Sequence, residues 1–213
     1  MDAPMATFRS SALAVSPPSA SPKSPAAAIA LMDAAERLFI ERGVERVGLA
    51  DIAAAAGLPA RAARGHYATR EQLLQAMQDR FVSDYCAHLD EAMARCPPGD
   101  WSARLRTFVR TGVDGYLDHV ALHDVVFHDQ RSHDRHAWQE NPVIERLVEL
   151  LEGGIAARVW VAPDPRLTAV IFFTAMHSAV DRVIASGEPA DRQRLSQTLI
   201  GYFERSVQWW TRF

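Results

Sequence analysis

Apolar residues recur every three or four positions along almost the whole chain, the spacing of amphipathic helices. In segment 25–43 charged residues occupy the opposite side, and the apolar stripe runs through Leu31, Ala35, Leu38 and Phe39. Gly43 follows as a stop signal. No segment keeps the period of two that a half-buried strand requires. The pattern therefore predicts an all-α fold.

We expect about nine helices, separated by Gly, Pro and polar stretches. Ser24 can cap the first helix, and Pro25 can occupy its first turn. The fourth helix begins with a Thr69-x-x-Gln72 capping box and ends in the Pro-rich stretch 96–100. In chain order the expected helices span residues 25–43, 48–57, 59–67, 69–96, 101–118, 120–131, 142–160, 165–186 and 190–211.

The second and third helices are short, and Ala56-Gly57-Leu58-Pro59 between them leaves room for a tight turn only. With a longer helix on each side, such a pair is typical of a helix-turn-helix unit. The second helix of such a unit lies in the major groove of DNA. Short helical hairpins also occur in ordinary bundles, so plain bundle packing is the alternative.

The third helix has a small cationic face. At about 100° per residue, the core side is expected to hold Ala60, Ala63 and Tyr67, the outer side Arg61, Ala62 and Gly65, and the flanks Arg64 and His66. Between Asp51 and Glu71 the chain has three arginines and no acidic residue. Arginine suits bidentate contact with guanine or a phosphate clamp. The alternative is that these arginines are simply solvated.

Arg70 directly follows the Thr69 cap, where the helix dipole favours an acid over a base. A bound phosphate would reverse that preference, because helix N-termini and cations both attract anions. A solvent-facing arginine is the alternative. The candidate DNA-binding residues are Ala60, Arg61, Ala62, Arg64, Gly65, His66 and Arg70.

Composition narrows the class of protein. Hydrophobic residues make up 48% of the 213 residues and charged residues 23%, both ordinary for a soluble globular protein. The formal net charge of −3 argues against bulk attraction to nucleic acid, but local charge can still build a binding face. Residues 1–24 are rich in Ser, Pro and Ala, and we expect a disordered tail there.

The two cysteines and the apolar runs indicate an intracellular protein. Cys86 and Cys96 would be roughly 15 Å apart on one helix, beyond disulfide reach, so we expect reduced thiols. No apolar run approaches the roughly 18 residues of a membrane span, and 169–176, the best, is expected to be a buried helix. We expect no signal peptide, no membrane partner and a cytoplasmic location, with association to the nucleoid when the protein is bound to DNA.

Small, apolar and capping residues are distributed in a particular order over the first four helices. They are Ala34-Ala35, Leu38-Phe39, Gly43, Asp51-Ile52-Ala53, Ala56-Gly57, Tyr67, Thr69-Arg70-Glu71 and Leu73. The stretch from Leu31 to Met77 that carries this set resembles the N-terminal domain of the tetracycline-repressor (TetR) family of bacterial regulators. The resemblance implies a helix-turn-helix that binds double-stranded DNA.

The chain departs from that family in the third helix. Family members usually have Tyr, contacting the DNA backbone, where this chain has Arg64, and Thr where it has Ala62. Gly48 replaces the Thr that caps the second helix and is a weaker cap. At Arg70 the family usually has Lys, used for phosphate contact. The details of base recognition therefore cannot be carried over from the family.

The resemblance also implies an effector enclosed by the C-terminal helices and a homodimer formed through residues 165–211. The candidate effector-binding residues are Phe108, Gly112, Tyr116, His119, His123, Phe127, Trp138, Phe173 and His177. Their mixture would suit an apolar or aromatic ligand with one or two polar groups. Plain core packing is the alternative, because aromatic stripes at helical spacing usually belong to the core.

The histidine-rich segment around 119–136 raises the question of a metal. His119 and His123 are four residues apart and could chelate an ion from one helical face. However, there is no HExxH pattern and no nearby Cys. We therefore expect no metal, no cofactor, no catalytic residue and no enzymatic activity, with a metal-binding helical enzyme as a remaining alternative.

The sequence thus predicts a ligand-responsive DNA-binding transcriptional regulator. We expect a repressor that a small-molecule effector releases from a palindromic operator. The alternative is a family relative with lost or altered DNA binding that acts through protein contacts. The expected domains are a tail at 1–24, a helix-turn-helix domain at 25–72 and an effector-binding and dimerisation domain at 73–213.

Overall fold

The computed structural model describes residues 24–128 and 141–208, and every regular element within these ranges is helical. In chain order the elements are α1 (Pro25–Arg42), η1 (Val44–Arg46), α2 (Leu49–Ala55), α3 (Ala60–His66), α4 (Arg70–Ala94), α5 (Trp101–Asp118), α6 (Val120–His123), the π-helical turn η2 (Asp124–His128), α7 (Pro142–Ala156), α8 (Pro165–Ser186) and α9 (Arg192–Ser206). The predicted all-α class is confirmed. Of the expected tail at 1–24, residues 1–23 lie outside the described residues, and Ser24 caps α1.

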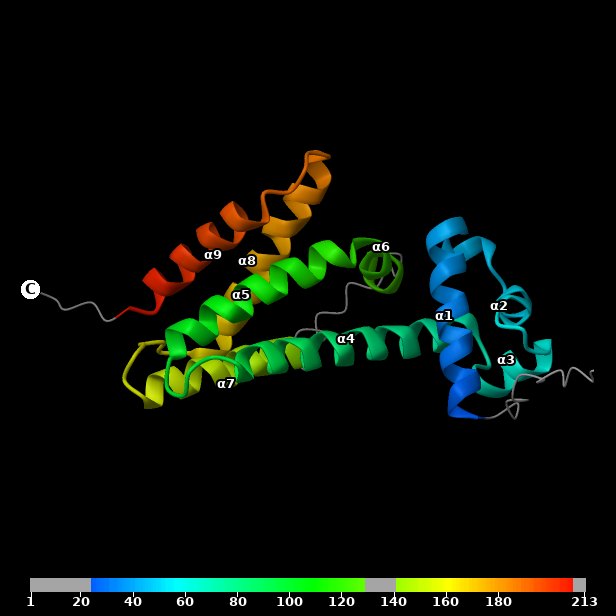
Figure 1. The fold of residues 1–213 in the computed structure, drawn as a ribbon, viewed down its shortest axis with the longest axis horizontal. Helices are drawn as coiled ribbons and strands as arrows, with labels where there is room; N and C mark the ends of the chain where they lie inside the picture. The colour runs from blue at the N-terminus through cyan, green and yellow to red at the C-terminus, as the bar shows by residue number, and fades with distance from the viewer. Residues whose placement is uncertain (1–23, 129–140, 209–213) are drawn as a thin grey trace, which may run out of the picture.

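The helices form two groups joined by α4 (Figure 1). At one end of the molecule α1, α2 and α3 pack around the start of α4. From there α4 runs into the second group, where it contacts α5 and α7, with α8 and α9 beyond them. Short α6 and η2 lie against α1, on the side of the bundle that faces the N-terminal group. They are therefore the second connection between the groups, besides α4.

Side-chain caps fix several helix ends where the sequence predicts them. Ser24 Oγ accepts a hydrogen bond from the Ala27 amide at 3.2 Å, so α1 begins as expected. Asp100 and Asp164 cap α5 and α8 in the same way, which is why these helices match the predicted 101–118 and 165–186. At the C-terminal ends of α1 and α8, Gly43 and Gly187 adopt positive φ angles of 82° and 67°.

Three helices differ from their predicted bounds by more than two residues. The segment predicted as 142–160 is helical only to Ala156, because Arg158 takes a positive φ of 59° and the chain turns to bury Trp160. The segment predicted as 120–131 is α-helical only to His123 and then π-helical. The last helix begins at Arg192, behind an Asp191 cap, and ends at Ser206. Within 190–211, residues 209–211 lie outside the described part.

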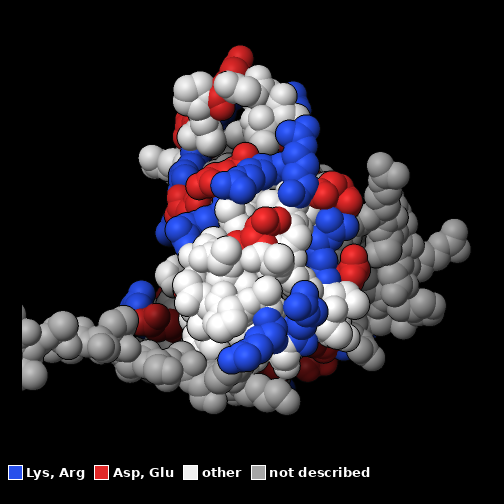
Figure 2. Space-filling model, turned by 90° about the vertical axis from the view of Figure 1, so that its right-hand side faces the viewer, with Lys and Arg blue, Asp and Glu red and all other residues white. Residues whose placement is uncertain are grey.

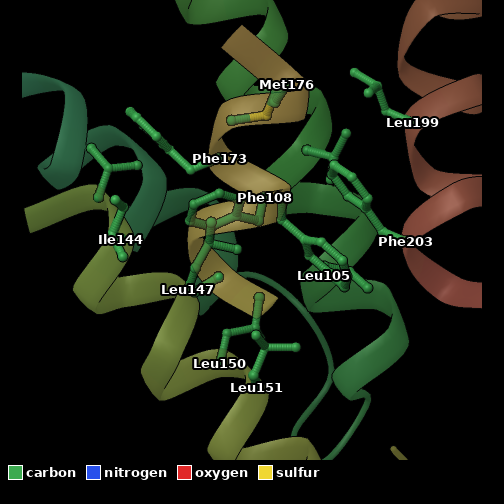
Figure 3. Close-up of a cluster of buried hydrophobic side chains, with 14 of the residues drawn as sticks. Leu105, Phe108, Ile144, Leu147, Leu150, Leu151, Phe173, Met176, Leu199 and Phe203 are labelled. Atoms are coloured by element: carbon green, nitrogen blue, oxygen red, sulfur yellow. The ribbon is translucent and has the colours of Figure 1, made fainter. Parts of the chain in front are cut away.

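The buried apolar residues form two clusters. The N-terminal cluster combines α1, α2, α3 and the start of α4, and it also takes in Val125 and Val126 of η2. The C-terminal cluster fills the space between α4, α5, α7, α8 and α9. Figure 3 shows its centre, where side chains from α5, α7, α8 and α9 converge: Leu105, Phe108, Ile144, Leu147, Leu150, Leu151, Phe173, Met176, Leu199 and Phe203.

Arginine–carboxylate pairs join neighbouring helices around both clusters. Arg146 of α7 makes three hydrogen bonds of 2.8–2.9 Å to the carboxylate of Asp90 on α4. Arg80 of α4 bonds Asp33 and Glu36 of α1 at 2.6 and 3.2 Å. Further pairs link α5 to α9 and α7 to α8 through Arg106–Glu204, Arg192–Asp118 and Arg166–Glu145.

Helix α8 has the length and mean hydropathy, 1.4 over its best window, of a membrane span. The helix passes this test although it contains no uninterrupted apolar run of that length, as the sequence analysis expects. The reason is that a mean over 18 residues tolerates scattered polar side chains such as His177 and Asp181. In the structure one face of α8 is buried in the C-terminal cluster, through Phe172, Phe173 and Met176.

Candidate DNA-binding helix and effector site

The turn between α2 and α3 has the tight geometry that the sequence predicts. Gly57 takes a positive φ of 69°, which a residue with a side chain rarely adopts. The Leu58 amide donates to the Ala53 carbonyl at 2.8 Å, and Pro59 is extended before α3 begins. At the other end of α2, Asp51 accepts from the Gly48 amide at 3.0 Å, so Asp51 supplies a cap that Gly48 cannot.

Helix α3 turns Arg61 and Arg64 to solvent and buries Ala62 and Ala63, which are 0% and 1% exposed. Two predicted orientations are wrong: Ala62 points into the protein, and Ala60 is exposed. The cause is that α3 packs on α1 as well as on α2, so its buried side is shifted relative to a helix packed on one neighbour. Ala62 therefore serves packing, and its side chain is not available to DNA.

Gly65 and His66 end α3. A Cβ added to Gly65 would meet nothing within 4 Å, so the chain itself gives no steric reason for glycine here. Glycine within a helix costs roughly 0.5–1 kcal/mol relative to Ala. His66 is half-buried, and its Nε2 atom is buried without a hydrogen-bond partner in the described part of the chain. Next to it, burial raises the pKa of Tyr67, and the charge of Arg80 opposes that shift.

Arg70 is already engaged inside the protein. Its guanidinium donates to the carbonyl of Val44 at 3.0 Å and to the carboxylate of Glu45 at 3.0 Å. These contacts tie the start of α4 to η1. The helix itself is capped by Thr69, which accepts from the Gln72 amide at 3.2 Å. Gln72 reaches back to the Ala68 amide, one residue before the position that the capping box predicts.

The end of the molecule formed by α1–α3 is mixed in charge (Figure 2). In the lower part of this view, basic side chains stand on a largely uncharged surface. Above it, acidic and basic side chains alternate. In the described part of the chain, neither Arg61 nor Arg64 forms an ion pair or a side-chain hydrogen bond. No described acidic side chain therefore neutralises their positive charge.

A second set of polar and aromatic side chains gathers where α4, α5, α6 and α8 meet. The ring of His123 lies 4.0 Å from the ring of Tyr116 and 4.8 Å from that of Phe127, measured between centroids. His123 and His177 face each other with their Nε2 atoms 3.2 Å apart. The ring of Phe173 lies 4.7 Å from that of His177, tilted by 43°. The structure thus brings together five of the nine predicted effector residues.

The polar groups of this cluster are held by hydrogen bonds. The Tyr116 hydroxyl donates to Asp181 at 2.5 Å, and the Tyr85 hydroxyl donates to the Gly112 carbonyl at 2.9 Å. Burial raises the pKa of both phenols, and for Tyr116 the hydrogen bond to Asp181 raises it further. Both phenols are therefore neutral at physiological pH. The cluster combines aromatic walls with a few fixed donors and acceptors, as ligand sites commonly do.

The other predicted effector residues lie outside this set of contacting rings, although Gly112 and His119 border it through Tyr85 and Phe81. Phe108 belongs to the core in Figure 3, and Gly112 faces Met176 and Tyr85 in close packing. His119 is exposed, with its Nδ1 atom 2.9 Å from the Gly115 carbonyl. Trp138 lies outside the described residues.

Sequence reasoning missed three members of the cluster: Phe81, Tyr85 and Asp181. Phe81 packs against His119, His123 and Phe127. Its spacing from Tyr85, four residues on the long α4, was the available signal. Asp181 stands on α8, four residues after His177, and it becomes recognisable only when Tyr116 is placed beside it.

The histidines do not assemble a metal site among residues 24–128 and 141–208, where no group of three or more His, Cys, Asp or Glu side chains is placed to hold an ion. His119 and His123, the pair whose spacing could have chelated an ion, contact Gly115 and His177 respectively. Two further histidines of that segment, His133 and His136, lie outside the described residues.

Large apolar side chains remain exposed on α8 and α9. Leu167 and Ile171, one turn apart on α8, are 56% and 55% exposed, and Tyr202 of α9 is 64% exposed. The opposite faces are buried, with Phe172 stacked on Phe203 at 4.0 Å. These two helices therefore carry apolar surface that the described part of the chain leaves exposed.

Solved structures with the same fold are numerous but distant in sequence. The fatty acid degradation regulator FadR from Bacillus halodurans is 18% identical, with a TM-score of 0.70 over 85% of this chain and 96% of that chain. A bacterial regulatory protein in the tetR family from Rhodococcus RHA1 is 22% identical, with a TM-score of 0.66 over 87% and 98%. SmeT, solved as a complex with triclosan, is 16% identical, with a TM-score of 0.67 over 88% and 94%.

No curated protein matches the chain. Two family models do match it, and together they cover most of the described residues. "Bacterial regulatory proteins, tetR family" matches residues 31–77, which hold α2, α3 and the parts of α1 and α4 that pack on them. "Tetracyclin repressor-like, C-terminal domain" matches residues 100–201, from the cap of α5 into α9. The chain therefore belongs to the tetR family of bacterial regulatory proteins.

Proposed function

We propose that this transcriptional regulator is a homodimeric repressor that leaves a palindromic operator when a small molecule binds between α4, α5, α6 and α8. Residues 25–72 would bind double-stranded DNA, and residues 73–213 would bind the effector and the second subunit. The observation that supports this best is the double role of α6 and η2. His123 and Phe127 belong to the polar–aromatic cluster, while Val125 and Val126 between them pack in the N-terminal cluster.

This arrangement offers a physical route from effector to DNA. A ligand that displaces His123 from Tyr116 and His177 must also move the turn that carries Val126, which is fully buried in the N-terminal cluster. Packed cores respond to such a change by shifting between discrete arrangements. A ligand that binds one arrangement more tightly would then change the spacing of the two α3 helices and weaken operator binding.

The effector would be an apolar or aromatic molecule with one or two polar groups, because aromatic rings outnumber hydrogen-bonding groups in the cluster. SmeT provides a precedent within the fold, since it was solved with triclosan. The effector's binding residues on this chain would be Tyr116, His123, Phe127, Phe173 and His177. The DNA-binding residues would be Arg61, Arg64, Gly65 and Arg70, and no metal or catalytic group takes part.

The exposed side chains of α8 and α9 support the proposed dimer. An isologous interface places the same patch of both subunits in contact, and Leu167 and Ile171 would be covered there. Replacing Ile171 by Asp should convert the dimer to a monomer in light scattering and abolish operator binding. Val159→Asp is the matched control, because Val159 is also exposed and apolar but lies outside both helices. A monomeric wild type would contradict the proposed dimer.

The function is tested by incubating the full chain with fragments of bacterial genomic DNA and sequencing the fragments it retains, across a salt series. Selective retention of fragments with a palindromic site, weakening as salt rises, is the expected result. Retained sites upstream of genes would also provide a reporter for repression and an operator for effector screening. A chain that retains no fragment selectively would favour the alternative, a family relative that acts through protein contacts.

A further inference from the structure

The buried residues of α3 define the direction in which it faces outward. Ala62 and Ala63 are consecutive and fully buried, so the inward direction lies between them. At about 100° per residue, Arg61 and Arg64 each lie about 30° from the opposite, outward direction. The two arginines therefore share the centre of the exposed face, one turn apart, and neither lies at its edge.

The edges of that face hold very small residues. Ala60 and Gly65 are both exposed, and each lies about 70° from the outward direction, on opposite sides. When a helix enters the major groove, the centre of its outer face meets the base edges, whereas its flanks pass the phosphates. A phosphate clamp would need long cationic side chains on the flanks. This helix has them at the centre instead, and its flanks permit close approach to the groove.

The distinction between base contact and phosphate contact rests on where the two arginines lie on α3, and not on their residue type. Every Lys or Arg between residues 24 and 213 is an arginine, so the choice of arginine over lysine on α3 is not informative. What sets Arg61 and Arg64 apart is that both are exposed, lack an ion pair within the described chain and point the same way. Arg70, by contrast, is held by Val44 and Glu45.

We infer that Arg61 and Arg64 each bind the major-groove edge of a guanine in the operator half-site. Guanine presents two acceptors there, N7 and O6, which match the paired N–H donors of a guanidinium. Side chains three residues apart on a helix are separated by about 5–6 Å at Cβ, which is between one and two base-pair steps of about 3.4 Å. Each half-site should therefore contain two G·C pairs that are either adjacent or separated by one other base pair. The two guanines can lie on either strand. This inference rests on the proposed DNA binding.

The first test selects bound duplexes from a random library with the full chain and then replaces single guanines in the selected site by 7-deazaguanine. This base keeps its Watson–Crick pairing and phosphate but lacks the N7 acceptor. We expect two guanines per half-site at which the replacement weakens binding about fivefold or more, since it breaks one hydrogen bond from a charged donor, which is worth about tenfold or more. Replacing adenines of the same site by 7-deazaadenine should change binding by less than about twofold.

The second test assigns each guanine to its arginine. Arg61→Ala and Arg64→Ala should each become indifferent to 7-deazaguanine at one of the two positions while staying sensitive at the other. Arg110→Ala, which removes an exposed arginine on α5 without an ion-pair partner among the described residues, should leave both sensitivities intact. Circular dichroism melting of all three variants would verify that they are folded like the wild type.

The outcomes separate this inference from the proposed function. Selective binding that tolerates 7-deazaguanine everywhere would overturn guanine recognition and leave the regulator intact. Salt-sensitive binding without base preference, reduced by Arg64→Ala, would show that the arginines contact phosphates and would overturn it as well. A chain that binds no duplex would overturn the proposed function and the inference together.

Discussion

In the helical bundle Arg146 makes three hydrogen bonds to Asp90 and joins α7 to α4, whereas on α3 Arg61 and Arg64 contact no acid among the described residues. Arg146 and the other ion-paired arginines of the bundle are satisfied by the chain, so their role can be read from their partners. The α3 arginines share one face and have open flanks, so their role must be read from a partner outside the chain. The comparison separates cations that stabilise this fold from cations that the fold displays.

The strongest test of the comparison removes both displayed arginines. Arg61→Ala combined with Arg64→Ala should lower operator affinity by at least about 30-fold, because each bidentate base contact is worth about 1–3 kcal/mol. The free energy of unfolding should stay within about 0.5 kcal/mol of the wild type, since neither side chain has a partner to lose. Fluorescence anisotropy and urea unfolding on the same preparation measure both. A large loss of stability would mean that these arginines serve the fold after all.

The neutral phenols inside the bundle should make its stability depend on alkaline pH. Folding raises the pKa of Tyr116 and Tyr85 above the ordinary value, which is about 10. Their contribution is therefore complete below that pH and is lost as the pH rises above it. Tyr116→Phe should cost about 1 kcal/mol at neutral pH, through the lost bond to Asp181.

The same variant should show a shallower fall in stability above pH 10 than the wild type. Chemical unfolding at several pH values between about 7 and 11 measures this dependence. An equally steep fall in Tyr116→Phe would show that Tyr116 does not contribute to it.

Whether a structural feature could be predicted from the sequence depends on how far apart in the chain the residues that determine it are. The ends of α5 and α8 follow from Asp100, Asp164 and Gly187, which act on their own turns. The orientation of Ala62 was wrong because α3 packs on two helices, and helical periodicity assumes one buried direction.

The contacts of the candidate sites depend on longer range still. Arg70 meets Val44 across 26 residues, and Tyr116 meets Asp181 across 65. No local pattern specifies which side chains meet at such separations. The helices of the effector cluster could therefore be predicted, but the partners within it could not.

The other class of arginine in this comparison is ion-paired within the chain, and Arg146 represents it. Arg146→Ala should lower the free energy of unfolding by about 1 kcal/mol, because its bidentate geometry places it at the upper end for partly exposed pairs. Operator affinity should be unchanged when the protein is assayed well below its melting temperature. A marked loss of DNA binding with unchanged stability would blur the distinction between the two classes of arginine.

Arg70 is the intermediate case and has the smallest expected effect. Glu45→Gln keeps a polar side chain but removes the charge that holds the guanidinium at 3.0 Å. If Arg70 also serves a DNA phosphate, operator affinity should rise by about two- to fivefold, the value of an exposed pair, and its salt dependence should steepen. Arg70→Ala in the same assay should abolish that gain. Unchanged affinity in Glu45→Gln would assign Arg70 to the fold alone.

The packing of η2 also limits how this regulator can be rebuilt. Val125 and Val126 are far along the chain from α1–α3, yet they complete the hydrophobic cluster of those helices. A hybrid that joins another regulator's helix-turn-helix domain to this chain at residue 72 would therefore bring different side chains against these valines. To exchange operator specificity in this protein, η2 must be transplanted or redesigned together with that domain.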